Sequence, residues 1–155
     1  MKLYIRQKVL SLLDSYHIYN EHKELCYYVK SNFALLHHMN LYDVSDCKVG
    51  ELKELFGLMP KFSLIENGQE VVRLKKHFTW FKDYLDIEQL NWQVHGDFFS
   101  WNYQIYENGT LIATISEKLL VWSDTYEIDI HKNEDVVKVL LVVLALDAIQ
   151  CSSHS

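Results

Sequence analysis

The sequence predicts a mainly β (α+β) domain in which antiparallel strands form a closed barrel around one hydrophobic helix near the C-terminus. Three observations lead to this prediction. Aromatic residues make up 14% of the 155-residue chain, and such side chains suit the pleated, half-buried surface of a sheet. Alternating apolar segments joined by Asn-Gly pairs predict antiparallel hairpins. An apolar run near the C-terminus is too short for a bilayer and is therefore expected in the protein core.

Three segments predict hairpins of one common plan: an aromatic residue, an aliphatic residue two positions later, a polar turn and an alternating return segment. In two of them the turn is an Asn-Gly pair, at positions 67–68 and 108–109, which tolerates the positive φ angles of a type I′ turn. The third joins residues 16–21 to residues 25–33. After the second Asn-Gly pair, one strand face is predicted to carry Leu111, Ala113 and Ile115 and the other Thr114 and Ser116, so this strand is predicted to have one buried face.

The remaining strands are predicted from shorter patterns. Residues 126–131 alternate apolar and polar side chains, and residues 84–94 fit two short strands with a turn near Glu88-Gln89. Residues 3–13 are expected to form a strand that pairs with a distant segment. Residues 49–56 fit two structures equally, because the spacing of their apolar side chains suits a helix and the preceding polar turn suits a strand.

The last element is predicted to be a helix over residues 134–150. Asn133 can cap it, and acidic residues follow at the positive end of the helix dipole. Its uninterrupted apolar run covers residues 139–146, between Lys138 and Asp147, whereas a bilayer span needs about 20 mainly apolar residues. We therefore expect a core helix rather than a membrane anchor. A closed barrel covers such a helix on every side and removes exposed sheet edges.

Length, charge and cysteine content limit the number of domains and the classes of partner that we expect. At 155 residues the chain fits one domain over residues 1–150, with a short frayed tail at residues 151–155. The net charge is −6, and residues 61–155 supply all of it, with eight Lys and Arg against fourteen Asp and Glu. An acidic surface repels nucleic acid and anionic membranes, because both need clustered positive charge, although a small local basic site is compatible with it. We therefore expect no nucleic-acid partner. The three cysteines are far apart and lack zinc spacing, which favours a reducing cytoplasm and no metal or cofactor.

Short motifs along nearly the whole chain carry a family resemblance. They are Leu3-Tyr4-Ile5-Arg6-Gln7, Pro60-Lys61-Phe62-Ser63-Leu64, residues 97–113, residues 122–130 and the apolar helix to Ile149. Together they resemble the LURP-one-related family of the tubby C-terminal-like superfamily, to which the phospholipid scramblases are related. The resemblance implies a twelve-stranded antiparallel barrel around one central hydrophobic helix, and it favours a strand for the ambiguous segment. It implies little about activity: tubby domains bind phosphoinositide headgroups and scramblase relatives act at membranes, but a shared fold does not transfer a site.

One basic stretch is the strongest candidate for a binding site. Arg73 and Lys75 are two residues apart, hence on one face of a strand, and Lys61 lies in the same predicted hairpin. Paired cations of this kind can clamp a phosphate, and their spacing resembles the basic pair that tubby domains use for headgroups. A solvated strand exterior is the simpler interpretation of the same residues, because exposed strand faces are commonly charged.

A second group of residues contains metal-capable side chains. His37-His38 is followed by Asp43, Asp46 and Cys47. Adjacent histidines point to opposite faces of a strand, and the spacing of the group misses the usual zinc patterns. We therefore interpret these residues as polar loop residues and expect no metal.

Candidate catalytic groups are sparse. Glu127, Asp129 and His131 share one strand face, which the alternation pattern interprets as a solvated exterior. His95-Gly96-Asp97 fits a bulge or turn better than a catalytic group, because neither a G-x-S-x-G elbow nor a phosphate loop accompanies it. Asp147 is the unusual residue of the apolar helix, since a carboxylate near a core must be paired, hydrogen-bonded or protonated, unless it lies at the mouth of the barrel.

Three functional hypotheses follow. The first is a non-enzymatic binding or scaffold domain, whose ligand is a phospholipid headgroup or another small anion held by the basic stretch. The second is a protein-interaction domain whose acidic C-terminal half meets a basic protein partner. The third is a hydrolase with a site at the barrel mouth, which requires two of the groups His95, Asp97 and Glu127 within hydrogen-bond reach of each other.

Overall fold

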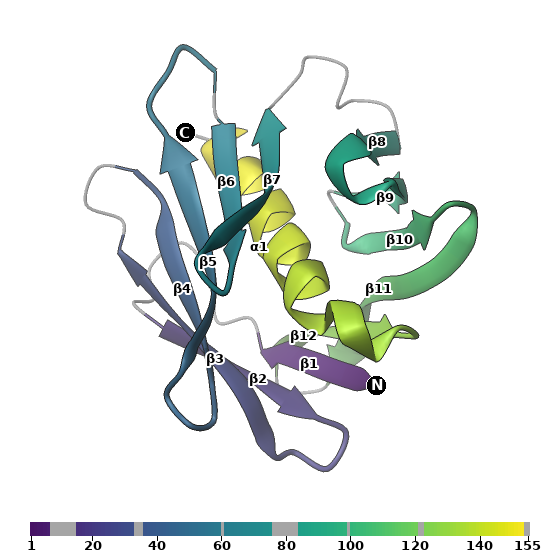
Figure 1. Ribbon diagram of the computed structural model, residues 1–155. Coiled ribbons are helices and arrows are strands. Elements are labelled where there is room, and N and C mark those ends of the chain that lie inside the picture. The colour runs from purple at the N-terminus through teal and green to yellow at the C-terminus, as the bar shows by residue number, and fades with distance from the viewer. Residues whose placement is uncertain are drawn as a thin grey trace.

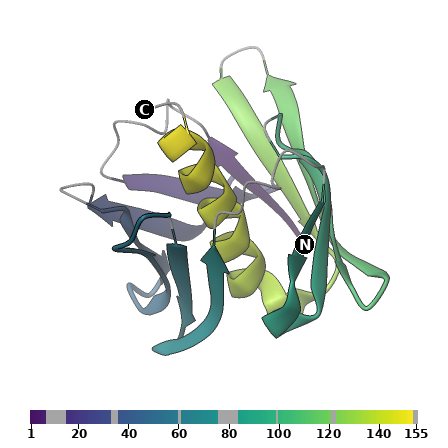
Figure 2. The same ribbon diagram turned by 90° about the horizontal axis from the view of Figure 1, so that it is seen from above.

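A computed structural model gives the architecture for residues 1–6, 15–32, 36–59, 61–75, 84–98, 100–120 and 123–153. Within these residues twelve antiparallel strands form one sheet that curls into a nearly closed barrel, and a helix runs through its middle (Figure 1, Figure 2). This confirms the predicted fold class. The strands are β1 (Lys2–Arg6), β2 (Ser15–Asn20), β3 (Leu25–Asn32), β4 (His38–Asp43), β5 (Lys48–Leu55), β6 (Lys61–Glu66), β7 (Gln69–Lys75), β8 (Tyr84–Ile87), β9 (Trp92–Asp97), β10 (Asn102–Glu107), β11 (Thr110–Leu120) and β12 (Ser123–Ile130). The helical elements are the 3-10 turns η2 (Glu88–Leu90) and η3 (Asn133–Asp135) and the helix α1 (Val136–Ser153).

The order of strands in the sheet is β7-β6-β5-β4-β3-β2-β1-β12-β11-β10-β9-β8. Strands that follow one another in the chain lie side by side, except β7 and β8, and the first strand, β1, pairs with the last, β12. The strands β7 and β8 are the two edges of the sheet, and no ladder joins them within the described residues. The barrel therefore has one seam, between β7 and β8, beside α1 in Figure 1.

Both Asn-Gly hairpins form where the sequence predicts them. The residues at positions 67–68 and 108–109 all have positive φ angles, between 47° and 82°, as a type I′ turn requires. In each hairpin the pairing register shifts soon after the turn, which leaves one extra residue on the return strand, Val71 in β7 and Ile112 in β11. These two β-bulges change which side chains share a face, because each shift of one residue turns a strand over relative to its partner.

The other strand predictions are confirmed with two differences. The ambiguous segment forms the strand β5 up to Leu55, with Phe56 in the loop that follows. The strands β8 and β9 are joined by η2 where a turn near Glu88 is predicted. The N-terminal strand is described only over Lys2–Arg6, so the rest of its predicted range lies outside the described residues. The loop interpretation is wrong for His38 and Asp43, which begin and end β4, whereas His37, Asp46 and Cys47 lie outside the strands. The strand β4 buries Met39 and Leu41 against the core.

The central helix fills the barrel. All residues from Val139 to Ile149 are buried, and Gly50 of β5 gives α1 room, since a Cβ atom there would lie 3.1 Å from Cδ2 of Leu141. The predicted range of 134–150 is shifted, because Asn133 begins η3 instead of capping α1 and the helix ends at Ser153. Within the described part of the chain, none of the helices combines the length and apolar character that a bilayer span requires.

Ion pairs fix the first turns of the helical segment to both sides of the barrel. Lys138 Nζ lies 2.9 Å from a carboxylate oxygen of Glu66 at the end of β6. Lys132 Nζ lies 2.8 Å from Glu107 at the end of β10 and 3.1 Å from Asp135. Because these partners stand on opposite sides of the seam, the N-terminal end of α1 is tied to both halves of the sheet.

Candidate functional site

The outer side of the β6–β7 hairpin collects the basic residues that the sequence singles out. Lys61 is the cross-strand partner of Lys75, and Ser63 is the partner of Arg73. Their neighbours Phe62 and Leu74 point inward and are buried, so the alternation of the strands directs the four polar residues to the outer side. Arg73 and Lys75 are exposed there, whereas Ser63 is only 3% exposed. We call these four residues, Lys61, Ser63, Arg73 and Lys75, the basic face.

The bulge at Val71 is what assembles the basic face. A hairpin continued without the bulge from the pair Glu66–Gln69 would place Arg73 opposite Phe62. With one extra residue in β7, the apolar pair Phe62–Leu74 comes together instead. The hydrophobic pattern therefore selects the bulged register, and the same shift brings both lysines to one side of the sheet.

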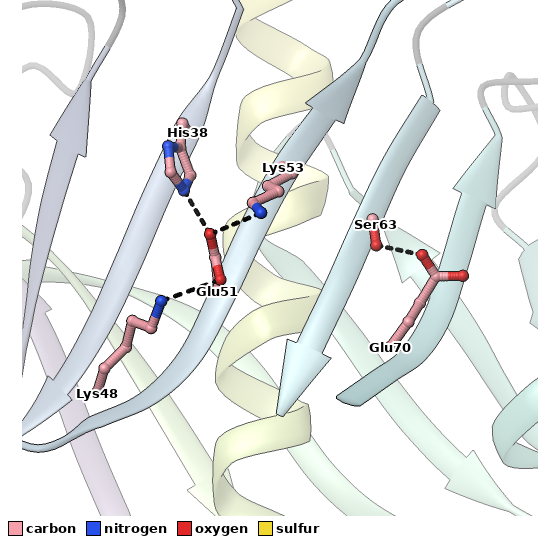
Figure 3. A network of polar contacts seen from close by, with 6 residues as sticks. All are labelled: His38, Lys48, Glu51, Lys53, Ser63 and Glu70. Carbon is pink, nitrogen blue, oxygen red and sulfur yellow. Dashed lines mark hydrogen bonds and ion pairs between the residues drawn. The ribbon is translucent and has the colours of Figure 1, made fainter. Parts of the chain in front are cut away.

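A carboxylate already occupies part of the basic face. Arg73 Nη2 donates to Oε2 of Glu70 at 3.0 Å, and the Ser63 hydroxyl donates to the same oxygen (Figure 3). The hydrogen bonds from Arg73 and then Ser63 lower the pKa of Glu70. A hydroxyl and a guanidinium that converge on one carboxylate oxygen form an oxyanion-binding arrangement.

Lys61 and Lys75 differ from Arg73 in lacking such a counter-ion. None of the described residues forms an ion pair with either lysine. Like charges directly opposite each other on neighbouring strands are unfavourable. The pair therefore concentrates positive charge at the end of the hairpin, and an anion bound there would relieve the repulsion.

A second polar network lies next to the basic face, on the outer side of β4 and β5. Oε1 of Glu51 lies 2.6 Å from Nε2 of His38 and 3.2 Å from Nζ of Lys53, and Oε2 lies 3.2 Å from Nζ of Lys48 (Figure 3). Burial alone would raise the pKa of Glu51, but the hydrogen bonds from His38 and the two lysines outweigh it and lower the pKa from 4.5 to about 2. This carboxylate is thus a fixed negative charge that holds three side chains in place.

Replacing Glu51 by Gln is expected to lower the free energy of unfolding at pH 7 by about 2 kcal/mol, because three donors lose a negatively charged partner and one of its two oxygens becomes an amide donor. The lowered pKa means that the contribution of Glu51 is present above pH 4.5 and is lost as the pH falls towards 2. Urea unfolding at pH 7 and pH 3 measures both effects. Glu117→Gln, at an exposed position of β11, is the matched control. Equal stability of the two variants at pH 7 would contradict the role given to Glu51.

A groove lies along the seam of the barrel, beside the basic face. Its volume is about 310 Å³. We call it the seam groove; it is lined by Arg73, Leu74 and Lys75 of β7 and by Leu85, Asp86, Glu88 and Gln89 of β8 and η2. Two cations of the basic face thus form one wall, and two carboxylates stand in the other.

The metal-capable residues take part in other contacts. His37 Nδ1 lies 2.5 Å from Glu54, His38 contacts Glu51, and the carboxylate of Asp43 accepts the backbone amides of Ser45 and Cys47. Among the residues that the structure describes, no three His, Cys, Asp or Glu side chains are arranged to hold a metal ion.

The candidate catalytic groups also make their contacts in different places. His95 lies edge-on between the rings of Tyr84 and Tyr106. Asp97 accepts the backbone amide of Ser100 at 3.2 Å, and Glu127 on β12 accepts the hydroxyl of Tyr4. These contacts tie each group to its own surroundings on the barrel.

Sequence analysis did not identify Ser63, Glu70 or Glu51 as members of a polar site. A two-residue period from Lys61 identifies Ser63, and Glu70 precedes Arg73 by three positions, yet neither signal reveals the bulge that brings them together. Glu51 carries no signal of its own, since its partners come from both β4 and β5.

Comparisons with known proteins place these features in a wider context. A model of the family described as LURP-one-related matches residues 1–147. The uncharacterised protein YxjI of Bacillus subtilis (strain 168) is 26% identical over 151 residues, which cover 96% of this chain and 93% of that protein. The X-ray structure of a protein from Arabidopsis thaliana has the same fold, with a TM-score of 0.66 and 17% identity over 96% of this chain and 90% of the other.

Proposed function

The chain belongs to the LURP-one-related family, and from this premise we propose that it is a non-enzymatic binding domain whose basic face holds a phosphate-bearing ligand. The observation that carries the proposal is the carboxylate of Glu70, held by Ser63 and Arg73 beside two lysines that pair with none of the described carboxylates. In the present geometry Ser63 and Arg73 hold an oxyanion of the chain itself, the carboxylate of Glu70, which a bound phosphate would have to displace. A phosphate carries more charge than a carboxylate, so it suits the additional lysines better.

The loop that leads into the basic face indicates whether the phosphate belongs to a membrane lipid or to a free compound. The loop between β5 and β6 exposes Phe56 and Leu58, whose side chains are 91% and 103% exposed. The next strand begins with Lys61 at the foot of this loop. Apolar side chains projecting beside clustered lysines are typical of segments that enter the interface of an anionic bilayer. This favours the phospholipid headgroup over a free phosphate compound as the ligand.

The acidic C-terminal half supports a protein-interaction role less well. Several of its carboxylates are engaged within the domain: Glu107 pairs with Lys132, and Glu127 pairs with both Lys2 and Lys118. An acidic side chain that already has an internal partner contributes less to the attraction of a basic protein. The basic face therefore carries the proposal.

The test uses flotation with vesicles of phosphatidylcholine alone or mixed with phosphatidic acid, together with calorimetric titration of glycerol 3-phosphate as the soluble counterpart. Arg73→Gln/Lys75→Gln is expected to weaken both interactions by about tenfold or more, since each charged contact contributes about 1.5–3 kcal/mol. The control is Lys2→Gln/Lys118→Gln, which removes the same charge from the β1–β12–β11 side of the barrel. Added salt should weaken binding of the unmodified protein.

The two arms distinguish the sources of the phosphate. Phe56→Ser/Leu58→Ser is expected to abolish flotation while it leaves the glycerol 3-phosphate titration unchanged. If that variant floats as well as the unmodified protein, the ligand is not taken from a bilayer through this loop. If the control double variant loses binding as strongly as Arg73→Gln/Lys75→Gln, the interaction depends on net charge alone and the basic face is not a site.

A further inference from the structure

We propose that the seam groove binds a zwitterionic phosphate ester, with its phosphate against Arg73 and Lys75 and its ammonium group against Asp86 and Glu88. This inference rests on the proposed function, because it uses two cations of the basic face. It adds the chemical class of the ligand and a second wall of the site, which neither the family match nor the related proteins specify.

The walls of the groove carry opposite charges. Arg73 and Lys75 belong to the edge strand β7, whereas Asp86 and Glu88 belong to β8 and η2 at the other edge of the sheet. No ladder hydrogen bonds join β7 and β8 within the described residues. The two sets of charged residues therefore line one space of about 310 Å³, which is at the lower end of the range for small-molecule pockets.

The opposed charges do not neutralise one another directly. Arg73 pairs with Glu70 of its own strand. In the described part of the chain, Lys75, Asp86 and Glu88 form no ion pair with any residue. Oppositely charged side chains that share a groove without touching leave room for a ligand that meets both.

The charge pattern selects among ligand classes. A simple anion in the groove is attracted by Arg73 and Lys75 but repelled by the two carboxylates, and a simple cation experiences the reverse. A ligand with a phosphate at one end and an ammonium at the other satisfies both walls at once. Leu74 and Leu85 also line the groove; Leu74 is buried in the core, so the half-buried Leu85 offers the apolar surface to a short carbon linker. The amide of Gln89 can donate or accept at either end.

The experiment compares two soluble probes by calorimetric titration of the full chain. Phosphoethanolamine carries both charges, and glycerol 3-phosphate carries the same phosphate monoester without the ammonium group. The unmodified protein is expected to bind phosphoethanolamine about tenfold more tightly, as for one additional charged hydrogen bond. Asp86→Asn/Glu88→Gln is expected to lose this preference while its affinity for glycerol 3-phosphate stays equal or rises.

The controls keep failure of the fold separate from failure of the site. Asp86 and Glu88 are exposed, so the double variant should keep the far-ultraviolet circular dichroism and melting temperature of the unmodified protein. Glu117→Gln/Glu134→Gln changes the same charge at exposed positions elsewhere and should retain the preference for phosphoethanolamine.

Each outcome decides between the two proposals. Equal affinity of the unmodified protein for both probes would overturn the zwitterion inference and leave the phosphate site intact. Retention of the preference in Asp86→Asn/Glu88→Gln would also overturn it, because the ammonium group would then be held elsewhere. Absence of binding for both probes would overturn this inference and the proposed function together.

Discussion

Replacing Asp147 by Asn is expected to raise the free energy of unfolding at pH 8 by up to about 4 kcal/mol. Asp147 lies in the core-filling helix and is only 5% exposed. Burial raises the pKa of its carboxyl group from 3.8 to about 7. An ionised carboxylate in such surroundings is costly, and an amide of the same shape removes the charge.

The pH dependence gives this prediction its sign. The folded protein binds the proton of Asp147 more strongly than the unfolded chain does, since the pKa is raised in the folded state. The contribution to stability is therefore fully present below pH 4, is lost as the pH rises towards 7, and stays constant above that. The Asn variant should lack this part of the pH dependence.

The surroundings of Asp147 reinforce the expectation. Tyr103 is 1% exposed and carries a buried hydroxyl for which the described residues provide no hydrogen-bond partner. Burial, followed by the charge of Asp147, raises the pKa of Tyr103 well above 10. The phenol thus stays neutral over the pH range of the experiment, and the change between pH 4 and 7 belongs to the carboxyl group.

Urea unfolding at pH 5 and pH 8 measures the effect. Asp86→Asn, at an exposed position of β8, is the matched control and should change stability by less than about 0.5 kcal/mol. An Asp147→Asn protein that is less stable than the unmodified protein at pH 8 would contradict the account, because it would mean that the ionised carboxylate is satisfied inside the barrel.

Replacing Gly96 by Ala is expected to lower the free energy of unfolding by about 3–5 kcal/mol, from backbone strain and steric overlap together. Gly96 has a φ angle of 124°, which side-chain-bearing residues rarely adopt. A Cβ atom there would lie 2.5 Å from the carbonyl oxygen of Asn102 and 2.8 Å from Cα of Tyr103. Both are backbone atoms of β10, which pairs with β9 at this point, so they cannot move aside cheaply.

Gly109 supplies the control for the same substitution. It also has a positive φ angle, 82°, but a Cβ atom there would meet no atom within 4 Å. Gly109→Ala should therefore show the strain alone, about 1–2 kcal/mol. Urea unfolding of both variants separates the two contributions. Equal losses for Gly96→Ala and Gly109→Ala would contradict the close approach of β9 and β10.

Local patterns predicted the hairpins and the helix because the responsible interactions are local. An Asn-Gly pair determines its own turn. The apolar run around Leu141 has no polar face, which by itself indicates a buried helix. The strand β4 was not predicted although Met39 and Leu41 alternate with polar residues, because His38 and Asp43 were compared only with metal-binding patterns and interpreted as loop residues.

The residues of the candidate site could be predicted only in part, because their arrangement depends on contacts between distant parts of the chain. The period of two placed Arg73 and Lys75 on one face, but the position of Lys61 relative to them depends on the bulge at Val71. The opposite wall of the seam groove depends on the path of the whole sheet, since β7 and β8 meet only because the barrel nearly closes. Pairings of that kind are set by packing over the complete chain, not by the residues of one hairpin.

The most direct test of the central claim is a nuclear magnetic resonance titration of the isotope-labelled, unmodified protein with glycerol 3-phosphate. Saturable shifts are expected for the backbone amides at residues 61–63 of β6 and 73–75 of β7, where the basic face lies. Amides of β11 and β12, on the other side of the barrel, should stay in place. Shifts confined to those strands, or no saturable shift at all, would contradict the assignment of the basic face as the binding site.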